Sequence, residues 1–131
     1  MLQNDDRKVV YLAGGFKSGW QAKVMKQLPG FNFLDPSQHN IEDASEYTRW
    51  DLDAVRASDI VLGYMESTNP GGYSLALEIG FAHALGKTVL LVDEITDPSV
   101  SRYFAMVRQC SESVFPSLSE AVEYLRKIDS R

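Results

Sequence analysis

One carboxylate in this sequence stands where a charge is costly. Residues 73–85 read YSLALEIGFAHAL, an almost wholly apolar stretch with helical spacing whose single acidic residue is Glu78. At about 100° per residue, the stripe of a helix that holds this carboxylate is otherwise apolar: Leu75, Ala82 and Leu85. A charge in such a stripe costs free energy unless it is paired, hydrogen-bonded or turned into a cavity. Glu78 is therefore the first candidate for a catalytic group, able to act as a nucleophile.

Glu78 also has a purely structural interpretation. A glutamate close to the start of a helix is stabilised by the helix dipole and by free backbone amides. Gly71 and Gly72 favour the functional interpretation, because glycines before a helix allow a ligand to come close to the backbone.

Asp51 is the second candidate. Within residues 41–57, which have helical spacing, its neighbours four residues away are Tyr47 and Val55. Asp51 therefore lies at the edge of a stripe that also packs inward. A carboxylic acid there could protonate a leaving group, whereas the alternative is an ordinary solvated carboxylate, as we expect Asp53 to be.

Aromatic residues and histidines carry weaker signals. Phe16, Tyr47 and Trp50 could stack on a planar base or simply pack in the core. His83 projects about 140° from the glutamate on the same helix, so we expect it at the surface or at an interface. His39 lies in a loop, PSQHN, whose geometry the sequence does not define. Two distant histidines and one cysteine lack a zinc-like spacing, so we expect no metal and no cofactor.

These residues must be positioned by alternating strands and helices. Three short apolar runs rich in β-branched residues predict strands buried on both faces, at residues 9–13, 60–64 and 88–92. Two further strands could lie at residues 31–34 and 113–115. Helical spacing occurs at residues 19–28, about 41–57, about 73–85, about 99–109, and 117–128. This alternation predicts a parallel sheet, because each parallel return needs a crossover.

We therefore expect an α/β fold in which residues 1–131 form a single domain. Its architecture would be three-layer and doubly wound, with a five-stranded parallel sheet in a flavodoxin-like (Rossmann-like) order. Ligands bind such sheets beyond the carboxyl ends of the strands, near the point where the strand order reverses. Three loops are then candidates for the site, at residues 14–19, 65–72 and 93–98.

Composition limits the partners. The 131 residues include 13 basic and 18 acidic ones, a net charge of -5, which disfavours nonspecific binding to nucleic acid. No apolar run approaches the roughly 20 residues that cross a bilayer, and the first residues lack a basic leader. The single cysteine, Cys110, fits a reducing compartment. We expect a cytoplasmic protein that binds neither nucleic acid nor membranes.

Three segments in order resemble the nucleoside 2-deoxyribosyltransferases and the related nucleotide N-hydrolases. They are VYLAGGF at residues 10–16, DLDAV leading to ASDIVLG at residues 51–63, and LEIGFAHALGK at residues 77–87, before the strand at 88–92. The likeness spans about residues 9–114. It implies an enzyme without a cofactor that cleaves the N-glycosidic bond of 2′-deoxyribonucleosides and passes the sugar to another nucleobase.

The resemblance also implies roles for particular residues. Glu78 corresponds to the family's nucleophile, which would form a covalent deoxyribosyl-glutamate, as in retaining glycosidases. Tyr11 corresponds to a tyrosine beside that carboxylate, and Asp51 to an aspartate that contacts the sugar near the departing base. Phe16 corresponds to an aromatic residue that covers the base. Further residues are expected to bind the substrate: Gly14, Gly15, Trp50, Gly71, Gly72, Ser74 and Met106.

One departure from the family leaves the substrate open. Gly72 stands where the transferases often have an aspartate for the sugar's 5′ hydroxyl and the phosphate-recognising hydrolases often have a serine. Contacts to the 5′ end are expected instead from Ser74, Ser67 or backbone amides of residues 69–72. Both a free nucleoside and a 5′-monophosphate remain possible substrates.

The resemblance further implies a homo-oligomer in which a neighbour completes the active site. Residues 102–106, RYFAM, carry more large apolar groups than a solvated helix usually shows.

Two alternatives to the transferase remain. PGGYSLALE at residues 70–78 is similar to the P-G-G-x-G-T-x-x-E motif of nucleoside-monophosphate phosphoribohydrolases, although Ser74 and Leu75 replace the glycine and threonine. That interpretation predicts an N-hydrolase of nucleoside 5′-monophosphates that releases free base. The other alternative is a non-catalytic nucleotide-binding sensor module, since such folds host many functions. The presence of Tyr11, Asp51 and Glu78 together counts against a pure binder.

Overall fold

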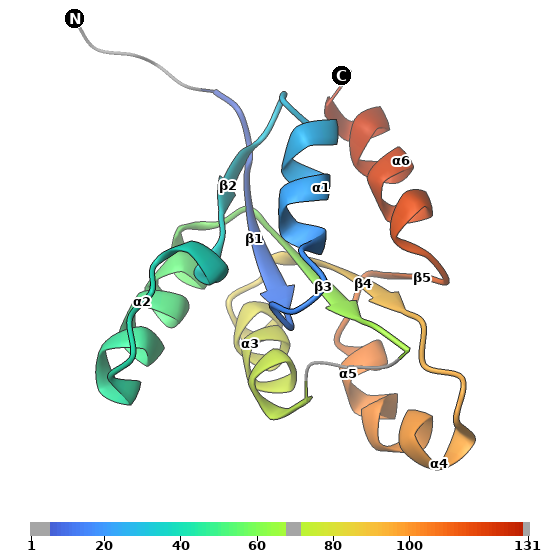
Figure 1. Ribbon diagram of the computed structural model, residues 1–131. Coiled ribbons are helices and arrows are strands. Elements are labelled where there is room, and N and C mark those ends of the chain that lie inside the picture. Colours follow the sequence, from blue (N-terminus) through green and yellow to red (C-terminus); the bar gives the residue numbers. More distant parts are fainter. Residues whose placement is uncertain (1–5, 68–71, 130–131) are drawn as a thin grey trace, which may run out of the picture.

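Five parallel strands form one sheet in the order β2-β1-β3-β4-β5 (Figure 1). The computed structural model describes residues 6–67 and 72–129. The strands are β1 (Val9–Gly14), β2 (Asn32–Leu34), β3 (Ile60–Met65), β4 (Thr88–Asp93) and β5 (Ser113–Phe115). Every pairing between neighbours is parallel. The expected flavodoxin-like order is confirmed, and the two tentative strands are both present.

Helices cover both faces of the sheet, as Figure 1 shows. On one face lie α1 (Trp20–Gln27) and α6 (Leu118–Asp129). On the other lie α2 (Ala44–Ala57), α3 (Gly72–Ala84) and α5 (Ala105–Gln109), while the short α4 (Pro98–Ser101) lies beyond the carboxyl end of β4. Successive residues of a strand point to opposite faces, so each strand contributes to both cores. In β1, Val10 and Leu12 pack against α1 and α6, whereas Tyr11 and Ala13 pack against α2 and α3. This is the expected three-layer, doubly wound α/β domain.

Local sequence signals explain where the helices begin. The side chain of Asp43 accepts a hydrogen bond from the Glu46 N–H at 3.0 Å, so α2 starts at Ala44 and not at residue 41 as expected. Asp97 caps α4 in the same way through the Ser99 N–H at 2.9 Å. Within the described ranges, 6–67 and 72–129, no helix has the length and apolar character needed to cross a membrane.

The helix expected at about residues 99–109 is broken into three pieces. Between α4 and α5, residues Arg102–Phe104 form a 3-10 turn, η2. Phe104 leaves helical geometry with φ -105° and ψ 13°. This bend lets the Phe104 ring pack against the core between α3 and the sheet, whereas Tyr103 beside it stays exposed. Side-chain packing thus overrides the helical spacing of this segment.

The strand order reverses between β1 and β3. The chain leaves β1 toward α1 on one face and leaves β3 toward α3 on the other. A crevice at the carboxyl ends of these two strands is the usual ligand site of such sheets. Gly14 ends β1 at this point with φ +152°, and a Cβ there would lie 2.8 Å from the Tyr64 carbonyl oxygen. Glycine is therefore required where the two strands approach the crevice.

Candidate active site

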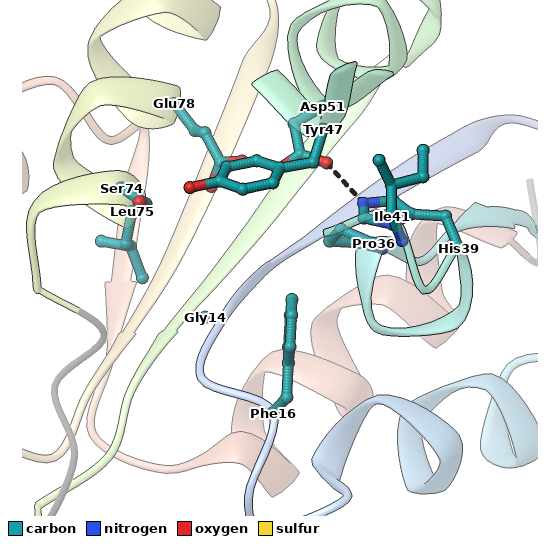
Figure 2. Close-up of a pocket in the computed structure, with 10 residues that line it drawn as sticks. All are labelled: Gly14, Phe16, Pro36, His39, Ile41, Tyr47, Asp51, Ser74, Leu75 and Glu78. Atoms are coloured by element: carbon teal, nitrogen blue, oxygen red, sulfur yellow. Dashed lines mark hydrogen bonds and ion pairs between the residues drawn. The ribbon is translucent and has the colours of Figure 1, made fainter. Parts of the chain in front are cut away.

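A cavity of about 300 Å³ opens beside this crevice (Figure 2). Its walls come from the loops after β1 and β2 and from helices α2 and α3. The lining residues are Gly14, Phe16, Pro36, His39, Ile41, Tyr47, Asp51, Ser74, Leu75 and Glu78. Figure 2 shows the Phe16 ring pointing toward the cavity centre, and Tyr47 shares the cavity wall with Asp51 and Glu78. Aromatic and apolar walls with a few convergent polar groups suit a small planar ligand.

Glu78 lies on α3 and is 7% exposed. Burial raises the pKa of its carboxyl from the ordinary 4.5 to about 7; the hydrogen bond from Tyr11 lowers it and the charge of Asp51 raises it. The sequence could not say which effect dominates, and the structure assigns the largest part to burial. Leu75 and Ala82 share its buried stripe as expected, but Leu85 is 42% exposed because it lies beyond the end of α3.

The helix start does not stabilise this carboxylate. The helix α3 begins at Gly72, six positions before Glu78. The stabilising effect of a helix dipole falls off within the first turn. The structural interpretation, a glutamate held by the dipole and free amides, therefore does not fit, and Tyr11 is the group that holds the anion.

Tyr11 lies on β1 and is completely buried. Its hydroxyl donates a hydrogen bond to Glu78 Oε2. Burial and then the neighbouring Glu78 charge raise the pKa of the phenol well above its usual range. The hydroxyl therefore keeps its proton and stays a donor to the carboxylate.

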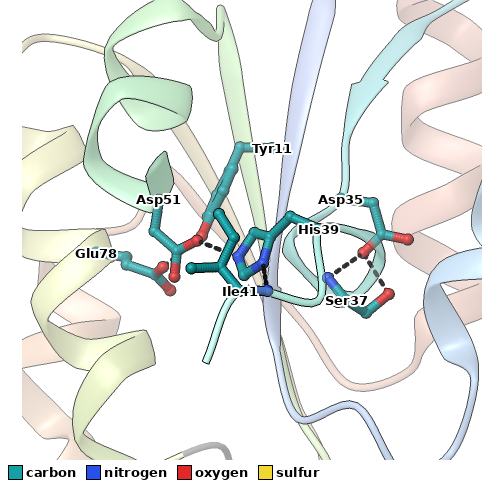
Figure 3. A network of polar contacts seen from close by, with 7 residues as sticks. All are labelled: Tyr11, Asp35, Ser37, His39, Ile41, Asp51 and Glu78. Carbon is teal, nitrogen blue, oxygen red and sulfur yellow. Dashed lines mark hydrogen bonds and ion pairs between the residues drawn. The ribbon is translucent and has the colours of Figure 1, made fainter. Parts of the chain in front are cut away.

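Asp51 faces the same cavity from α2. Burial raises the pKa of its carboxyl, and the hydrogen bond with His39 acts in the opposite direction. The distance from His39 Nε2 to Asp51 Oδ1 is 3.1 Å. Figure 3 shows Tyr11, Asp51 and Glu78 turned toward one another from β1, α2 and α3. The structure thus brings together the three residues that the sequence selected as catalytic candidates.

His39 is the main contributor that the sequence did not assign. It follows the 3-10 turn η1 (Pro36–Gln38), which leads away from the carboxyl end of β2. The sequence held a signal for this position, because the loops that follow two parallel strands begin at the same edge of the sheet. The expected loop at residues 93–98 contributes no described residue to the cavity wall.

The expected binding residues divide into two groups. Gly14, Phe16 and Ser74 line the cavity. Gly15 does not; its carbonyl accepts hydrogen bonds from Trp20 Nε1 at 2.9 Å and Gln21 Nε2 at 3.0 Å, which fix the loop that carries Phe16.

The remaining expected residues lie outside the lining. Trp50 packs edge-on against the His39 ring, with centroids 4.7 Å apart, and lines a separate hollow beside β2. Met106 lies on α5 and is exposed, away from the cavity wall of its own chain. Gly72 is the first residue of α3, with φ +62°. Gly71 lies outside the described residues.

The lining carries negative charge. Asp51 and Glu78 are its carboxyl groups, and none of its described members is Lys or Arg. In the part of the chain that the structure describes, no three His, Cys, Asp or Glu side chains are grouped as metal ligands would be.

Comparisons with known proteins identify the family and the fold. The protein family described as "Nucleoside 2-deoxyribosyltransferase like" matches residues 7–95, a segment that contains Tyr11, Asp51 and Glu78. No curated protein matches the chain. A 2-desoxiribosyltransferase from Leishmania mexicana has a similar structure, with a TM-score of 0.73 and 24% identity, over 92% of this chain and 97% of that one.

A second solved structure, the CMP N-glycosidase BcmB of Clostridium botulinum, superimposes with a TM-score of 0.59 and 19% identity, over 92% of this chain and 99% of that one. At these identities the two structures establish the fold. The family match extends over more than half of the chain, and it confirms the resemblance noted in the sequence. The chain therefore belongs to the nucleoside 2-deoxyribosyltransferase-like family.

Proposed function

We propose that the protein is an enzyme that cleaves the N-glycosidic bond of 2′-deoxyribonucleosides and passes the deoxyribose to another nucleobase. The observation that carries this proposal is the meeting of three groups at one cavity: Glu78 and Asp51 lie in its wall, and buried Tyr11 donates to Glu78 from β1. The membership of the chain in a deoxyribosyltransferase-like family supports the same reaction.

The proposed chemistry has two displacement steps. In the first, a Glu78 carboxylate oxygen bonds to the anomeric carbon while the bond from this carbon to the base nitrogen breaks. The electron pair of that bond goes to the base, which takes a proton from Asp51. In the second, a nitrogen of the incoming base attacks the anomeric carbon, the ester to Glu78 breaks, and the proton of the incoming base returns to Asp51. Two inversions give overall retention, as in retaining glycosidases.

The reactive form of the two carboxyls holds one proton, with Glu78 as the anion and Asp51 as the acid. Burial raises the pKa of both carboxyls, and the charge of Asp51 raises that of Glu78 further. A pair of this kind titrates as a unit. Below about pH 7 the resting proton lies on Glu78, so it must pass to Asp51 before the first displacement.

The charge of the lining favours a nucleoside over a nucleotide. A 5′-monophosphate would bring two negative charges to a wall with two carboxyls and, among its described residues, no Lys or Arg. The alternative, an N-hydrolase of nucleoside 5′-monophosphates, keeps one supporting observation. Gly72 at the start of α3 has open space where a side chain would be, so a phosphate could approach the backbone there.

A non-catalytic sensor is the least favoured function. Holding Glu78 as a buried anion lowers the stability of the fold, and a protein that only binds nucleotides has no use for that charge. Removal of the Glu78 carboxylate should make such a sensor more stable, whereas it should abolish the activity of an enzyme.

One product analysis tests the proposal. The protein is incubated with each nucleoside and each 5′-monophosphate, with and without a second base, and the products are separated. A new nucleoside that forms only when the second base is present supports transfer. Free base released from the monophosphate alone supports the hydrolase, and no turnover of any substrate would contradict both. Intact-mass measurement with a slow 2′-fluorinated nucleoside then identifies the residue that carries the sugar.

We further propose that the protein is a homo-oligomer. Four large apolar side chains are exposed on α3 and on the neighbouring segment from η2 to α5: Tyr73, Leu77, Tyr103 and Met106. Such an apolar surface is typical of a subunit interface. Met106 would then contribute to a neighbour's cavity, because it lies away from that of its own chain. A sedimentation experiment that finds a strict monomer with its activity intact would contradict this assembly.

A cytoplasmic location belongs to the same proposal. Cys110 is a free thiol and partly exposed, which fits a reducing compartment.

A further inference from the structure

The imidazole of His39 is held so that its two nitrogens have different tasks (Figure 3). Nδ1 accepts a hydrogen bond from the Ile41 backbone N–H at 3.0 Å. A backbone N–H can only donate, so Nδ1 must present a lone pair. The ring proton therefore resides on Nε2, which donates to Asp51 Oδ1 at 3.1 Å.

The surroundings of His39 fix this arrangement. Asp35, at the end of β2, accepts hydrogen bonds from the N–H and the hydroxyl of Ser37, at 2.9 and 2.7 Å, and so sets the turn η1 that leads to His39. The Trp50 ring meets the imidazole edge-on. The His39 side chain is only 12% exposed. The ring is thus held from the β2 loop on one side and from α2 on the other.

We propose that His39 is a positioning residue that acts through Asp51, holding its Oδ1 so that the proton for the departing base is carried on Oδ2. Because Oδ1 already accepts the Nε2–H, a proton on the carboxyl is favoured on the other oxygen. His39 does not relay this proton, since Nδ1 is committed to the Ile41 amide. The inference rests on the proposed function, in which Asp51 is the acid.

The same contact affects the titration of the site. Four groups face the Asp51 carboxyl or share its cavity wall: His39 from the β2 loop, Tyr11 from β1, Glu78 from α3, and Tyr47 one turn earlier on α2. The His39 donor lowers the pKa of Asp51. Its removal therefore increases the proton affinity of the carboxyl pair. The centre of a bell-shaped pH profile then moves to higher pH, whichever carboxyl holds the shared proton.

Two substitutions separate the donor from the ring. His39→Phe keeps an aromatic ring against Trp50 but removes the N–H, whereas His39→Gln keeps an N–H donor. We expect His39→Phe to lower kcat/KM by about 10- to 100-fold, the size of effect that misplaced catalytic groups produce. The centre of its pH profile should move upward. His39→Gln should recover most of the rate and the parent profile, and His83→Gln, at an exposed histidine on α3, should match the parent protein.

A double substitution tests whether His39 acts through Asp51. In an Asp51→Asn background, His39→Phe should cause no further loss, because the group it positions is already removed. Additive losses would overturn the inference, and so would an unchanged pH profile in an active His39→Phe protein.

Nitrogen-15 NMR of the parent imidazole tests the contact without any turnover. We expect the Nε2–H form at His39, with the Nε2 resonance changed by Asp51→Asn. A proton on Nδ1 would overturn the inference. If the parent protein turns over no substrate, the proposed function is wrong. If the parent is active and His39→Phe equals it in rate and pH profile, only the role of His39 is wrong.

Discussion

The carboxylate at Glu78 should make the folded protein less stable, and its replacement should reveal this. Glu78→Gln keeps the size of the side chain and an oxygen that can accept the Tyr11 hydroxyl, but it removes the charge. We expect the variant to be nearly inactive, with a fall of several orders of magnitude in the chemical step, and at the same time more stable than the parent protein.

The size of the gain follows from the titration of the buried carboxyl. Burial raises the pKa of Glu78 from its ordinary 4.5 to about 7. At about 1.4 kcal/mol for each pKa unit, ionising this 7% exposed group costs the folded state about 3 kcal/mol. Between pH 4.5 and about 7 the folded protein binds more protons here than the unfolded chain does. The cost is therefore absent below this window and complete above it.

Urea unfolding of both proteins across the pH range measures this cost. The difference in free energy of unfolding should be near zero at about pH 4 and approach about 3 kcal/mol in favour of Glu78→Gln at about pH 8.5. The matched control is Glu112→Gln at an exposed glutamate beside β5, which should change neither activity nor the pH dependence of stability. A Glu78→Gln difference that stays constant with pH would refute the assignment of a buried, costly anion.

Three further results are expected. Tyr11→Phe removes the hydrogen bond that lowers the pKa of Glu78, so kcat/KM below neutral pH should fall by about tenfold or more, with a smaller loss at alkaline pH in the measured profile. Asp51→Asn should slow the reaction by on the order of 100-fold, because the departing base loses its acid. The loss should be smaller for a nucleoside whose base departs without protonation, and rates measured with both kinds of nucleoside test this. Gly14→Ala places a Cβ 2.8 Å from the Tyr64 carbonyl oxygen at φ +152°, and should cost about 1–3 kcal/mol in urea unfolding; equal stability would show that the strand end relaxes easily.

Patterns that repeat along the chain made the fold predictable. The apolar runs defined β1, β3 and β4 to within one residue at the carboxyl end, and the alternation of strands and helices fixed the parallel order. Glu78 could be selected because helix geometry alone places it on the buried stripe. The same reasoning failed for residues 99–109, where the packing of the Phe104 ring breaks the helix.

Non-repetitive segments limited the prediction of the site. The path from β2 to His39 depends on the Asp35 hydrogen bonds that set η1 and on contact with Trp50 from α2. Asp35 and Ser37 are two residues apart, but Trp50 meets His39 only in the folded protein, so spacing gives no indication of that contact. For the same reason the sequence left Trp50 open between stacking on a base and packing in the core, and its ring packs against the histidine.

The polar groups and the loop residues of the site stand on two kinds of structure. Tyr11, Asp51 and Glu78 stand on β1, α2 and α3, whereas Phe16 and Ile41 reach the cavity from loops. Regular elements hold the proposed reacting groups rigidly, and loops accept substitution with little loss of stability. Base preference can therefore change during evolution while the reaction itself is retained. A library that randomises the two loop positions and keeps the three polar groups is the natural starting point for redirecting the enzyme to modified bases.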